Sequence, residues 1–239
     1  MYRLRIIAGP NGSCKTTLTK DLQDNFNLNF GHYINADDIE VMLSKGGKLS
    51  FRKYKLSVST EIFTTFFTTH PLQAKCSDVR FNVQKNTLYL SAGLKNFSYF
   101  TALLADFLRT KILESNQTFT SETVMSSKDK ILFLQKAKEN NYRIYLYYIS
   151  TDNVLINKDR VADRVKKGGH AVPEQKIEKR YRGSMANLLD AIKLSNRAYL
   201  FDNSGQTHRL VAEITEGKEL NFNPDFVPYR FEKYVLNKL

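Results

Sequence analysis

The sequence predicts an α/β fold with a mostly parallel central sheet flanked by helices. Short apolar runs alternate with stretches of helical spacing along much of the 239-residue chain. A glycine-rich segment, "AGPNGSCKTT", follows the first apolar run and opens the first helical stretch. Polar turns at Gly9, Asp37, Glu122 and Asp202 follow four of the apolar runs. Such turns are expected at the sheet edge where the carboxyl ends of parallel strands meet and ligands bind.

The elements of the N-terminal half can be justified in order. "RLRIIA" is apolar and β-branched at its centre, which predicts a strand, and "CKTTLTKDLQDNF" has the spacing of a helix. "HYINADDIEVMLS" predicts a strand that stops at Asp37 and becomes a helix, because acidic residues favour a helix N-terminus. "KYKLSVSTEIFTTFFTTH" favours a helix. The segment from Pro71 to Gly93 indicates an irregular insertion or a small hairpin.

The C-terminal half shows a clearer alternation. "FTALLADFLRTKILES" predicts a helix, "QTFTSETV" a strand with a polar end, "KDKILFLQKAKENN" an amphipathic helix and "YRIYLYYIS" a buried strand. Two helices follow over 153–167 and 174–196, separated by "GGHAVP", whose glycines and proline interrupt a helix. "AYLFDNSG" predicts another strand that ends in a polar turn. A hairpin or a strand and a helix complete the chain to Leu239.

Composition limits the classes of function. The chain has 36 basic and 24 acidic side chains, a net charge of +12, which indicates an anionic partner. The basic residues are spread along the chain without a long Lys/Arg tail, so we do not expect nucleic acid as the partner. Two cysteines and four scattered histidines exclude a disulfide framework and a zinc cluster. We expect a cytoplasmic protein without a membrane partner, because we find neither a signal peptide nor an apolar run of roughly 20 residues.

The segment "AGPNGSCKTT" matches most of the phosphate-loop pattern G-x-x-x-x-G-K-[ST], with Cys14 in place of the second glycine. The backbone N–H groups of such a loop surround a phosphate at a helix N-terminus. Its lysine reaches the β- and γ-phosphates of ATP, and its threonine hydroxyl ligates Mg²⁺. We therefore predict a P-loop NTPase fold with an ATP site made of the following residues: Gly9, Pro10, Asn11, Gly12, Ser13, Cys14, Lys15, Thr16 and Thr17.

Cys14 leaves two outcomes open. A glycine at this position gives the backbone freedom and lets the phosphate come close. Cysteine weakens ATP binding if the position requires a positive φ, and has little effect if φ is helical.

Two segments place carboxylates at predicted strand ends. Asp37 in "INADDIE" is our candidate base, because a carboxylate beside the phosphate loop can accept a proton from an attacking hydroxyl. The alternative is that Asp37 only caps a helix. Glu122 and Thr123 in "FTSETV" are candidates for a clamp on the substrate hydroxyl. A Walker-B-like contact with Mg²⁺ and a solvated strand end are the alternatives for this pair.

The segment "DRVADRVKKGGHAVPEQKIEKRYRGS" is the densest in positive charge. Arg160 and Arg164 are four residues apart and share a helix face, and Arg180 and Arg182 follow beyond the glycines. We predict a mobile flap at about 153–185 whose guanidinium groups close over the triphosphate and neutralise developing charge. The alternative is a pair of solvated basic helices.

Together these segments resemble the zeta toxin family of P-loop kinases, in particular its branch named for predicted ABC-type ATPases. The matching stretches are "IIAGPNGSCKTTL", "YINADDIE", "FTSETVMS", "RVADRVKKGGHAVPEQKIEKRYRGSMANL" and "YLFDNSG". They occur in family order and touch most of the chain, except roughly 45–95 and the last twenty residues. The long fourth stretch is much more specific than the phosphate loop.

The resemblance implies an adenylate-kinase-like core and ATP-dependent phosphorylation of a sugar hydroxyl. The acceptor is UDP-N-acetylglucosamine in the best-known members and NAD in other relatives. Carried over by position, Lys15 and Thr16 bind phosphate and Mg²⁺, and Asp37 is the catalytic base. Glu122 and Thr123 lie on the acceptor side, and Asn203 lies near the adenine. The flap arginines are Arg164 and Arg180, with Arg160 and Arg182 left open. The departure at Cys14 puts catalytic competence in question.

The sequence thus predicts one domain over residues 1–239, with an insertion at about 50–95. We expect a small-molecule kinase that uses ATP and Mg²⁺, and the resemblance raises the role of a toxin paired with an antitoxin protein. The alternative is a catalytically impaired nucleotide-binding or nucleic-acid-binding protein that retains the fold.

Overall fold

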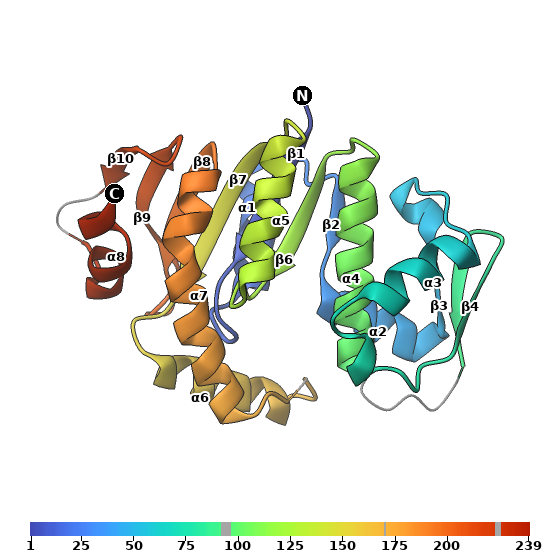
Figure 1. Ribbon diagram of the computed structural model, residues 1–239. Helices are drawn as coiled ribbons and strands as arrows, with labels where there is room; N and C mark the ends of the chain where they lie inside the picture. Colours follow the sequence, from blue (N-terminus) through green and yellow to red (C-terminus); the bar gives the residue numbers. More distant parts are fainter. Residues whose placement is uncertain (92–96, 170, 223–225) are drawn as a thin grey trace. The chain divides into compact units, whose positions relative to one another are not determined.

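A computed structural model describes residues 1–91, 97–169, 171–222 and 226–239 (Figure 1). These residues form two compact units. Unit 1 comprises Met1–Phe30 and Glu122–Leu239, and unit 2 comprises Gly31–Ser121. The single domain over residues 1–239 stays a prediction.

Unit 1 is built on a mostly parallel sheet. Its elements in chain order are β1 (Arg3–Ala8), α1 (Lys15–Phe26), α5 (Lys128–Glu139), β7 (Arg143–Ser150), α6 (Val154–Lys166), α7 (Glu174–Leu194), β8 (Arg197–Asp202), β9 (Arg209–Thr215), β10 (Glu219–Phe222) and α8 (Tyr229–Tyr234). β1 pairs parallel with β7, and β7 pairs parallel with β8. β9 and β10 extend the sheet as an antiparallel hairpin. Helices α5 and α7 lie side by side over one face and α1 lies over the other (Figure 1), so the predicted α/β fold is confirmed.

The sheet forms where the sequence is apolar on both strand faces. In β7, Ile144, Leu146 and Tyr148 on one face and Ile149 on the other are 0% exposed, as expected for a strand covered by helices on both sides. The Tyr148 hydroxyl lies 2.9 Å from Ser184 Oγ on α7, so its polar end is satisfied within the core. Burial raises the pKa of Tyr148 well above its ordinary value.

Unit 2 combines a short parallel pair with a small antiparallel sheet. Its elements are β2 (His32–Ile34), α2 (Ala36–Gly46), β3 (Lys48–Ser50), α3 (Thr60–Thr69), β4 (Phe81–Gln84), β5 (Thr87–Leu90), α4 (Phe97–Glu114) and the first residues of β6 (Phe119–Thr123). β2 pairs parallel with β6, and the antiparallel sheet has the order β3-β5-β4. The predicted insertion therefore contains ordered secondary structure.

The insertion differs in detail from its prediction. Only Thr60–Thr69 of the expected helix is α-helical, because the Ser59 side chain caps it and accepts a hydrogen bond from Ile62 N at 3.2 Å. The predicted small hairpin is β4–β5, whose turn residues Lys85 and Asn86 both have positive φ, 47° and 63°. Residues 92–95 of the insertion, and His170 in "GGHAVP", lie outside the described residues.

Phenylalanine rings form the core of unit 2. The Phe63 ring meets the rings of Phe107 and Phe81 edge to face, with centroids 4.9 Å apart in both pairs. Phe51 and Phe100 are 0% exposed and also lie against Phe63. The insertion thus shares its apolar core with helix α4.

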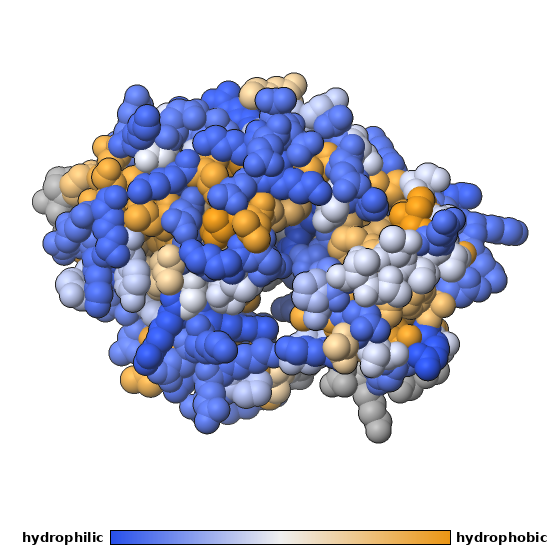
Figure 2. Space-filling model, viewed as in Figure 1, coloured by the Kyte–Doolittle hydropathy of each residue, from blue (hydrophilic) through white to orange (hydrophobic). Residues whose placement is uncertain are grey.

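The face of the molecule drawn in Figure 2 is largely hydrophilic. Blue residues cover much of the face drawn in Figure 2, with apolar side chains among them, and Leu132 on α5 is an exposed apolar residue at 63%. Among the described residues, no helix combines the length and the apolar composition of a membrane span.

Candidate functional site

The phosphate loop, residues 9–16, directs its carbonyl groups toward the protein. Pro10 O accepts hydrogen bonds from Ser13 N at 3.3 Å and from Ser13 Oγ at 2.9 Å. Asn11 O accepts from Asn157 Nδ2 at 2.6 Å, and Ser13 O accepts from Asn203 Nδ2 at 3.0 Å. The loop is therefore closed internally at Ser13 and held from outside by Asn157 and Asn203.

The N–H groups of the loop have a different environment. Among the described residues, no acceptor is hydrogen-bonded to the N–H groups of Asn11, Gly12, Cys14 or Thr16. Consecutive backbone N–H groups at a helix N-terminus form an anion-binding site. This part of the loop can therefore donate several hydrogen bonds to one phosphate group.

Lys15 lies across the start of the loop. Its Nζ donates to Gly9 O at 3.0 Å and to Pro10 O at 3.1 Å. The ammonium group therefore lies beside the loop, where it can neutralise a bound anion. Thr16 and Thr17 in the first turn of α1 are exposed, and Thr17 N donates to Cys14 O at 3.1 Å.

Cys14 adopts the left-handed conformation, with φ 65° and ψ 40°. This is the conformation that glycine adopts without steric cost and that costs other residues roughly 1–2 kcal/mol. The structure therefore has a positive φ at Cys14, and the weaker ATP binding expected in this case stays a prediction. Its thiol is partly buried, with Sγ 3.9 Å from Gly12 O.

The turn after β8 braces the loop from one side. Asn203 is 5% exposed, and its Nδ2 holds Ser13 O. Arg160 on α6 donates to Asn203 O at 2.8 Å and to Gly205 O at 2.9 Å. The structure thus places Arg160 and Asn203 together, and gives Arg160 a role in supporting this turn.

The other basic residues of the predicted flap lie in different places. Arg180 on α7 donates to Asn11 Oδ1 at 3.2 Å, so its guanidinium group reaches the loop. Arg182 pairs with Glu178 at 2.6 Å and its side chain is 76% exposed. Arg164 is exposed on the last turns of α6. Arg180 is thus joined to the phosphate loop by a hydrogen bond.

Glu122 and Thr123 end β6 beside the start of the loop. Gly9 N donates to Thr123 O at 3.3 Å, and Thr123 Oγ1 accepts from Met125 N at 3.1 Å. Both side chains are partly exposed. Because successive side chains of a strand point to opposite faces, the two residues present their polar groups on different sides of β6.

Asp37 does not end a strand. β2 stops at Ile34 and α2 begins at Ala36, so Asp37 lies in the first turn of α2. The boundary is earlier because Asn35 is the N-cap, and its Oδ1 accepts from Asp37 N at 3.0 Å. Asn35 is therefore the N-cap, and Asp37 contributes negative charge to the first turn of α2.

The carboxylates at the start of α2 influence each other. Burial and then the negative charge of Asp37 raise the pKa of Asp38, and Lys53 opposes this shift. Burial and the charge of Asp38 raise the pKa of Tyr54 to about 12. The first turn of α2 therefore presents Asp37 on the surface of unit 2, next to the Asp38 carboxyl group, whose pKa is raised.

Few of the described side chains are candidates for binding a metal ion. Within the described ranges, no cluster of three His, Cys, Asp or Glu side chains could hold a metal ion. The exposed Thr16 hydroxyl offers a hard oxygen ligand, which suits Mg²⁺ bound mainly through phosphate oxygens and water.

The sequence analysis did not predict two residues that support the site. Asn157 is 0% exposed, and Arg230 on α8 is 5% exposed and bonds Ser150, Asp152 and Asp202 at the ends of β7 and β8. Asn157 shares a helix face with Val161, which is buried, and an Asn on a buried face is a detectable signal. Nothing in the local pattern around Arg230 indicates its partners.

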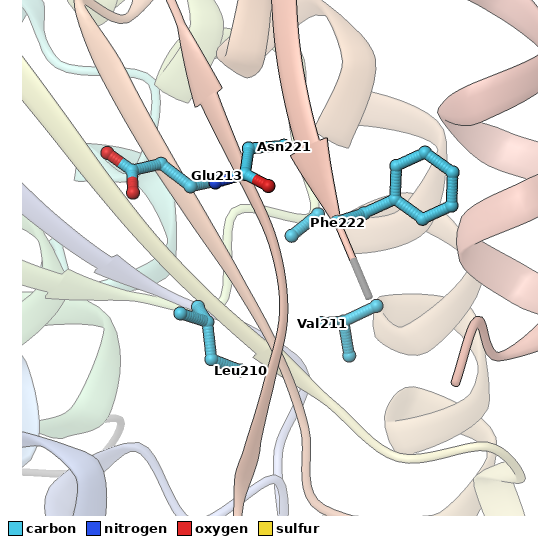
Figure 3. Close-up of a pocket in the computed structure, with 6 residues that line it drawn as sticks. Leu210, Val211, Glu213, Asn221 and Phe222 are labelled. Carbon is cyan, nitrogen blue, oxygen red and sulfur yellow. The ribbon is translucent and has the colours of Figure 1, made fainter. Parts of the chain in front are cut away.

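A shallow pocket lies away from the phosphate loop, on the β9–β10 hairpin (Figure 3). Its lining residues are Leu210, Val211, Ala212, Glu213, Asn221 and Phe222. Glu213 and Asn221 are paired across the two strands, while the Phe222 side chain extends to the other side of the hairpin. None of the predicted site residues lines this pocket.

Comparison with known families matches this chain to the model described as zeta toxin, over residues 89–210, just over half of the chain. The chain belongs to the zeta toxin family. The match includes β6, the strand that ends at the phosphate loop, and both helices that hold Asn11. The family has a P-loop kinase-like fold, in agreement with the architecture of unit 1.

Solved structures support the fold of this zeta toxin family member. The crystal structure of AvrRxo1-ORF1:-ORF2 with ATP superposes with a TM-score of 0.60 at 15% identity, over 100% of this chain and 65% of that one. The same proteins with sulphate ions superpose with a TM-score of 0.59 at 14% identity, over 100% of this chain and 65% of that one. This chain therefore spans about two thirds of those relatives.

A curated relative is an uncharacterized protein of Haemophilus influenzae. It is 38% identical over 63 residues, which cover 26% of this chain and 45% of that protein. The matched part of this zeta toxin family member thus spans less than half of that protein.

Proposed function

We propose that this chain is an ATP-dependent kinase that transfers the γ-phosphate of ATP to a hydroxyl group of a small nucleotide-type substrate. The observation that carries the proposal is the loop of residues 9–16, whose carbonyls are held by the protein while four N–H groups have no acceptor among the described residues. Lys15 and Arg180 add positive charge at the same loop. This arrangement suits a bound polyphosphate.

Different residues of the loop bind different parts of Mg-ATP. The N–H groups bind the β-phosphate, and Lys15 exchanges its bonds to Gly9 O and Pro10 O for β- and γ-phosphate oxygens. Thr16 would hold Mg²⁺ together with phosphate oxygens, and the ion would supply charge neutralisation during transfer. Thr17 and Ser13 belong to the same binding segment.

The catalytic roles outside the loop follow the family motifs. Asp37 is the proposed base that accepts the proton of the attacking hydroxyl. Glu122 and Thr123 are proposed on the acceptor side. Arg164 and Arg180 are the proposed flap arginines that neutralise charge on the transferred phosphoryl group.

The acceptor belongs to one of two classes that the family resemblance names, UDP-N-acetylglucosamine or NAD. ATP as donor is supported by the relative AvrRxo1-ORF1:-ORF2, which was crystallised with ATP. That relative also consists of two gene products in one crystal, which supports a search for an antitoxin that binds this chain.

A second candidate function rests on Cys14. Its φ of 65° is an angle that glycine adopts without strain, and the Cβ atom of cysteine adds strain there. The second candidate is therefore a catalytically impaired protein that binds nucleotide, or nucleic acid, without transferring phosphate.

The test is transfer of labelled γ-phosphate from Mg-ATP, under reducing conditions, to UDP-N-acetylglucosamine, NAD and a nucleotide panel. Label on one acceptor that disappears in Asp37→Asn, while ATP binding persists, is the result expected for the kinase. ATP binding without transfer by the native chain, together with transfer by Cys14→Gly, favours the impaired protein. Nucleic-acid affinity that falls steeply with salt would favour a nucleic-acid binder.

A further inference from the structure

Asn157 joins helix α6 to the phosphate loop through its side chain. The residue is 0% exposed, and its Nδ2 donates to Asn11 O at 2.6 Å. The Thr151 hydroxyl is hydrogen-bonded to Asn157 Oδ1, so the amide group is held in one orientation. A buried amide with both ends engaged has little freedom to turn.

The backbone of Asn157 touches the next residue of the loop. A Cβ atom added to Gly12 would lie 2.5 Å from Asn157 O and 3.0 Å from Asn157 Cα. Gly12 also has a positive φ of 76°. Asn157 therefore contacts two successive loop residues, one through its side chain and one through its backbone.

The contact with Asn11 O has a direct effect on an N–H group. The carbonyl of Asn11 and the N–H of Gly12 belong to the same planar trans peptide group, so they point in opposite directions. Asn157 holds the carbonyl on the protein side, and the Gly12 N–H must then point to the other side. That N–H group is one of the four that have no acceptor among the described residues.

We infer that Asn157 is a positioning residue that aims the Gly12 N–H at a phosphate of the bound nucleotide. The inference rests on the proposed function, because it assigns a use to the same loop. Asn157 lies on the first helix of the predicted flap, and Arg180 of the second flap helix bonds the Asn11 side chain. Both helices of the predicted flap therefore attach to the loop at Asn11.

The experiment measures the dissociation constants of Mg-ATP and of inorganic tripolyphosphate for the full chain by calorimetry. Asn157→Ala is expected to weaken both ligands by about tenfold, because one donor loses its orientation. Tripolyphosphate lacks the base and the sugar, so an equal loss for both ligands places the defect at the phosphates.

Asn153→Ala is the matched control. Asn153 is the N-cap of the same helix, and its Oδ1 accepts from Leu155 N at 2.9 Å. It has no contact with the loop among the described hydrogen bonds. Asn153→Ala is expected to leave both dissociation constants within about twofold of those of the native chain, since it perturbs α6 only at its end.

Asn157→Leu provides a second variant of similar volume that fills the buried site if Asn157→Ala does not fold. Unchanged affinity in either folded Asn157 variant would overturn the inference, and so would an equal loss in Asn153→Ala. If the native chain binds neither ligand, the proposed function itself fails. A native chain that binds both, with unchanged Asn157 variants, refutes the positioning role alone.

Discussion

At the scale of single residues, the phosphate loop concentrates its unusual geometry at Cys14. The residue has φ 65°, in a region that glycine enters without cost. Gly12, two residues earlier, has φ 76° and no space for a Cβ atom, so both positions of the loop need glycine-like backbone freedom. The sequence supplies glycine at only one of them.

Replacing Cys14 by glycine is expected to stabilise the chain by up to about 1 kcal/mol. The gain is the relief of the left-handed strain, reduced by the greater entropy of an unfolded glycine. The measurement is urea denaturation of the native chain, Cys14→Gly and Cys14→Ala. Alanine keeps the Cβ atom and its strain while it removes the thiol. If Cys14→Gly and Cys14→Ala have equal free energies of unfolding, backbone strain at Cys14 does not destabilise the native chain.

The raised pKa of Asp38 predicts that this residue makes the chain less stable as pH rises. Burial and Asp37 raise its pKa in the folded chain, so its stabilising contribution is present below the unfolded pKa and is lost as pH rises through the folded pKa. Asp38→Asn is therefore expected to be more stable than the native chain at pH 7. The difference should vanish below about pH 4, the ordinary pKa of aspartate.

The check is thermal denaturation of both proteins at pH 7 and pH 3.5. Asp37→Asn serves as a partner variant, because it removes the neighbouring negative charge and should bring the native Asp38 closer to ordinary behaviour. An Asp38→Asn variant that is less stable than the native chain at pH 7 would contradict the assignment.

At the scale of elements, the short helix α8 holds the ends of two strands. Arg230 Nε donates to Ser150 Oγ at 2.9 Å and its Nη2 donates to Ser150 O at 3.2 Å, at the end of β7. It also pairs with Asp202, which ends β8 and is 5% exposed. Asp202 precedes Asn203, whose amide group holds Ser13 O of the loop. The C-terminal helix therefore supports the turn that braces the phosphate loop.

Arg230→Ala is expected to cost about 3–5 kcal/mol of unfolding free energy, because it leaves the buried Asp202 carboxylate without its positive partner. The double variant Arg230→Ala with Asp202→Ala removes both charges and should recover part of this loss. Urea denaturation of the three proteins measures the difference. A double variant that is no more stable than Arg230→Ala would show that charge burial is not the cause.

At the scale of the whole molecule, the phosphate-binding groups belong to unit 1 and Asp37 belongs to unit 2. The predicted single domain implies one cooperative unfolding transition for the chain. Calorimetry tests this directly, because two separate transitions would contradict the single-domain prediction.

Mg-ATP at about 100 times its dissociation constant is expected to raise the melting temperature by about 5–10 °C. Ligand binding at that excess adds about 2.7 kcal/mol, and each kcal/mol shifts a chain of this size by about 2–4 °C. Lys15→Ala should remove most of the shift, since Lys15 Nζ lies at the loop. An equal shift in Lys15→Ala would place the nucleotide elsewhere.

The sequence alone was enough for the fold class and most of the elements. The runs that became β1, β7 and β8 and the helices α5, α6 and α7 were predicted within a few residues, because hydrophobic period and backbone propensity are local properties. The phosphate-loop motif was equally readable, since its spacing is local. The boundary at Asp37 was misplaced because Asn35, a short polar residue at the end of an apolar run, acts as the cap.

The tertiary structure alone decided how the loop is held. Asn157 and Asn203 bond loop carbonyls across 146 and 190 residues of chain, and Arg230 reaches Ser150 across 80. No local pattern encodes such partners, because they meet only after the sheet has brought the strand ends together. The positive φ of Cys14 was likewise undecided by its residue type. The sequence determined which groups can bind a phosphate, and the packing of distant segments decided which way they point.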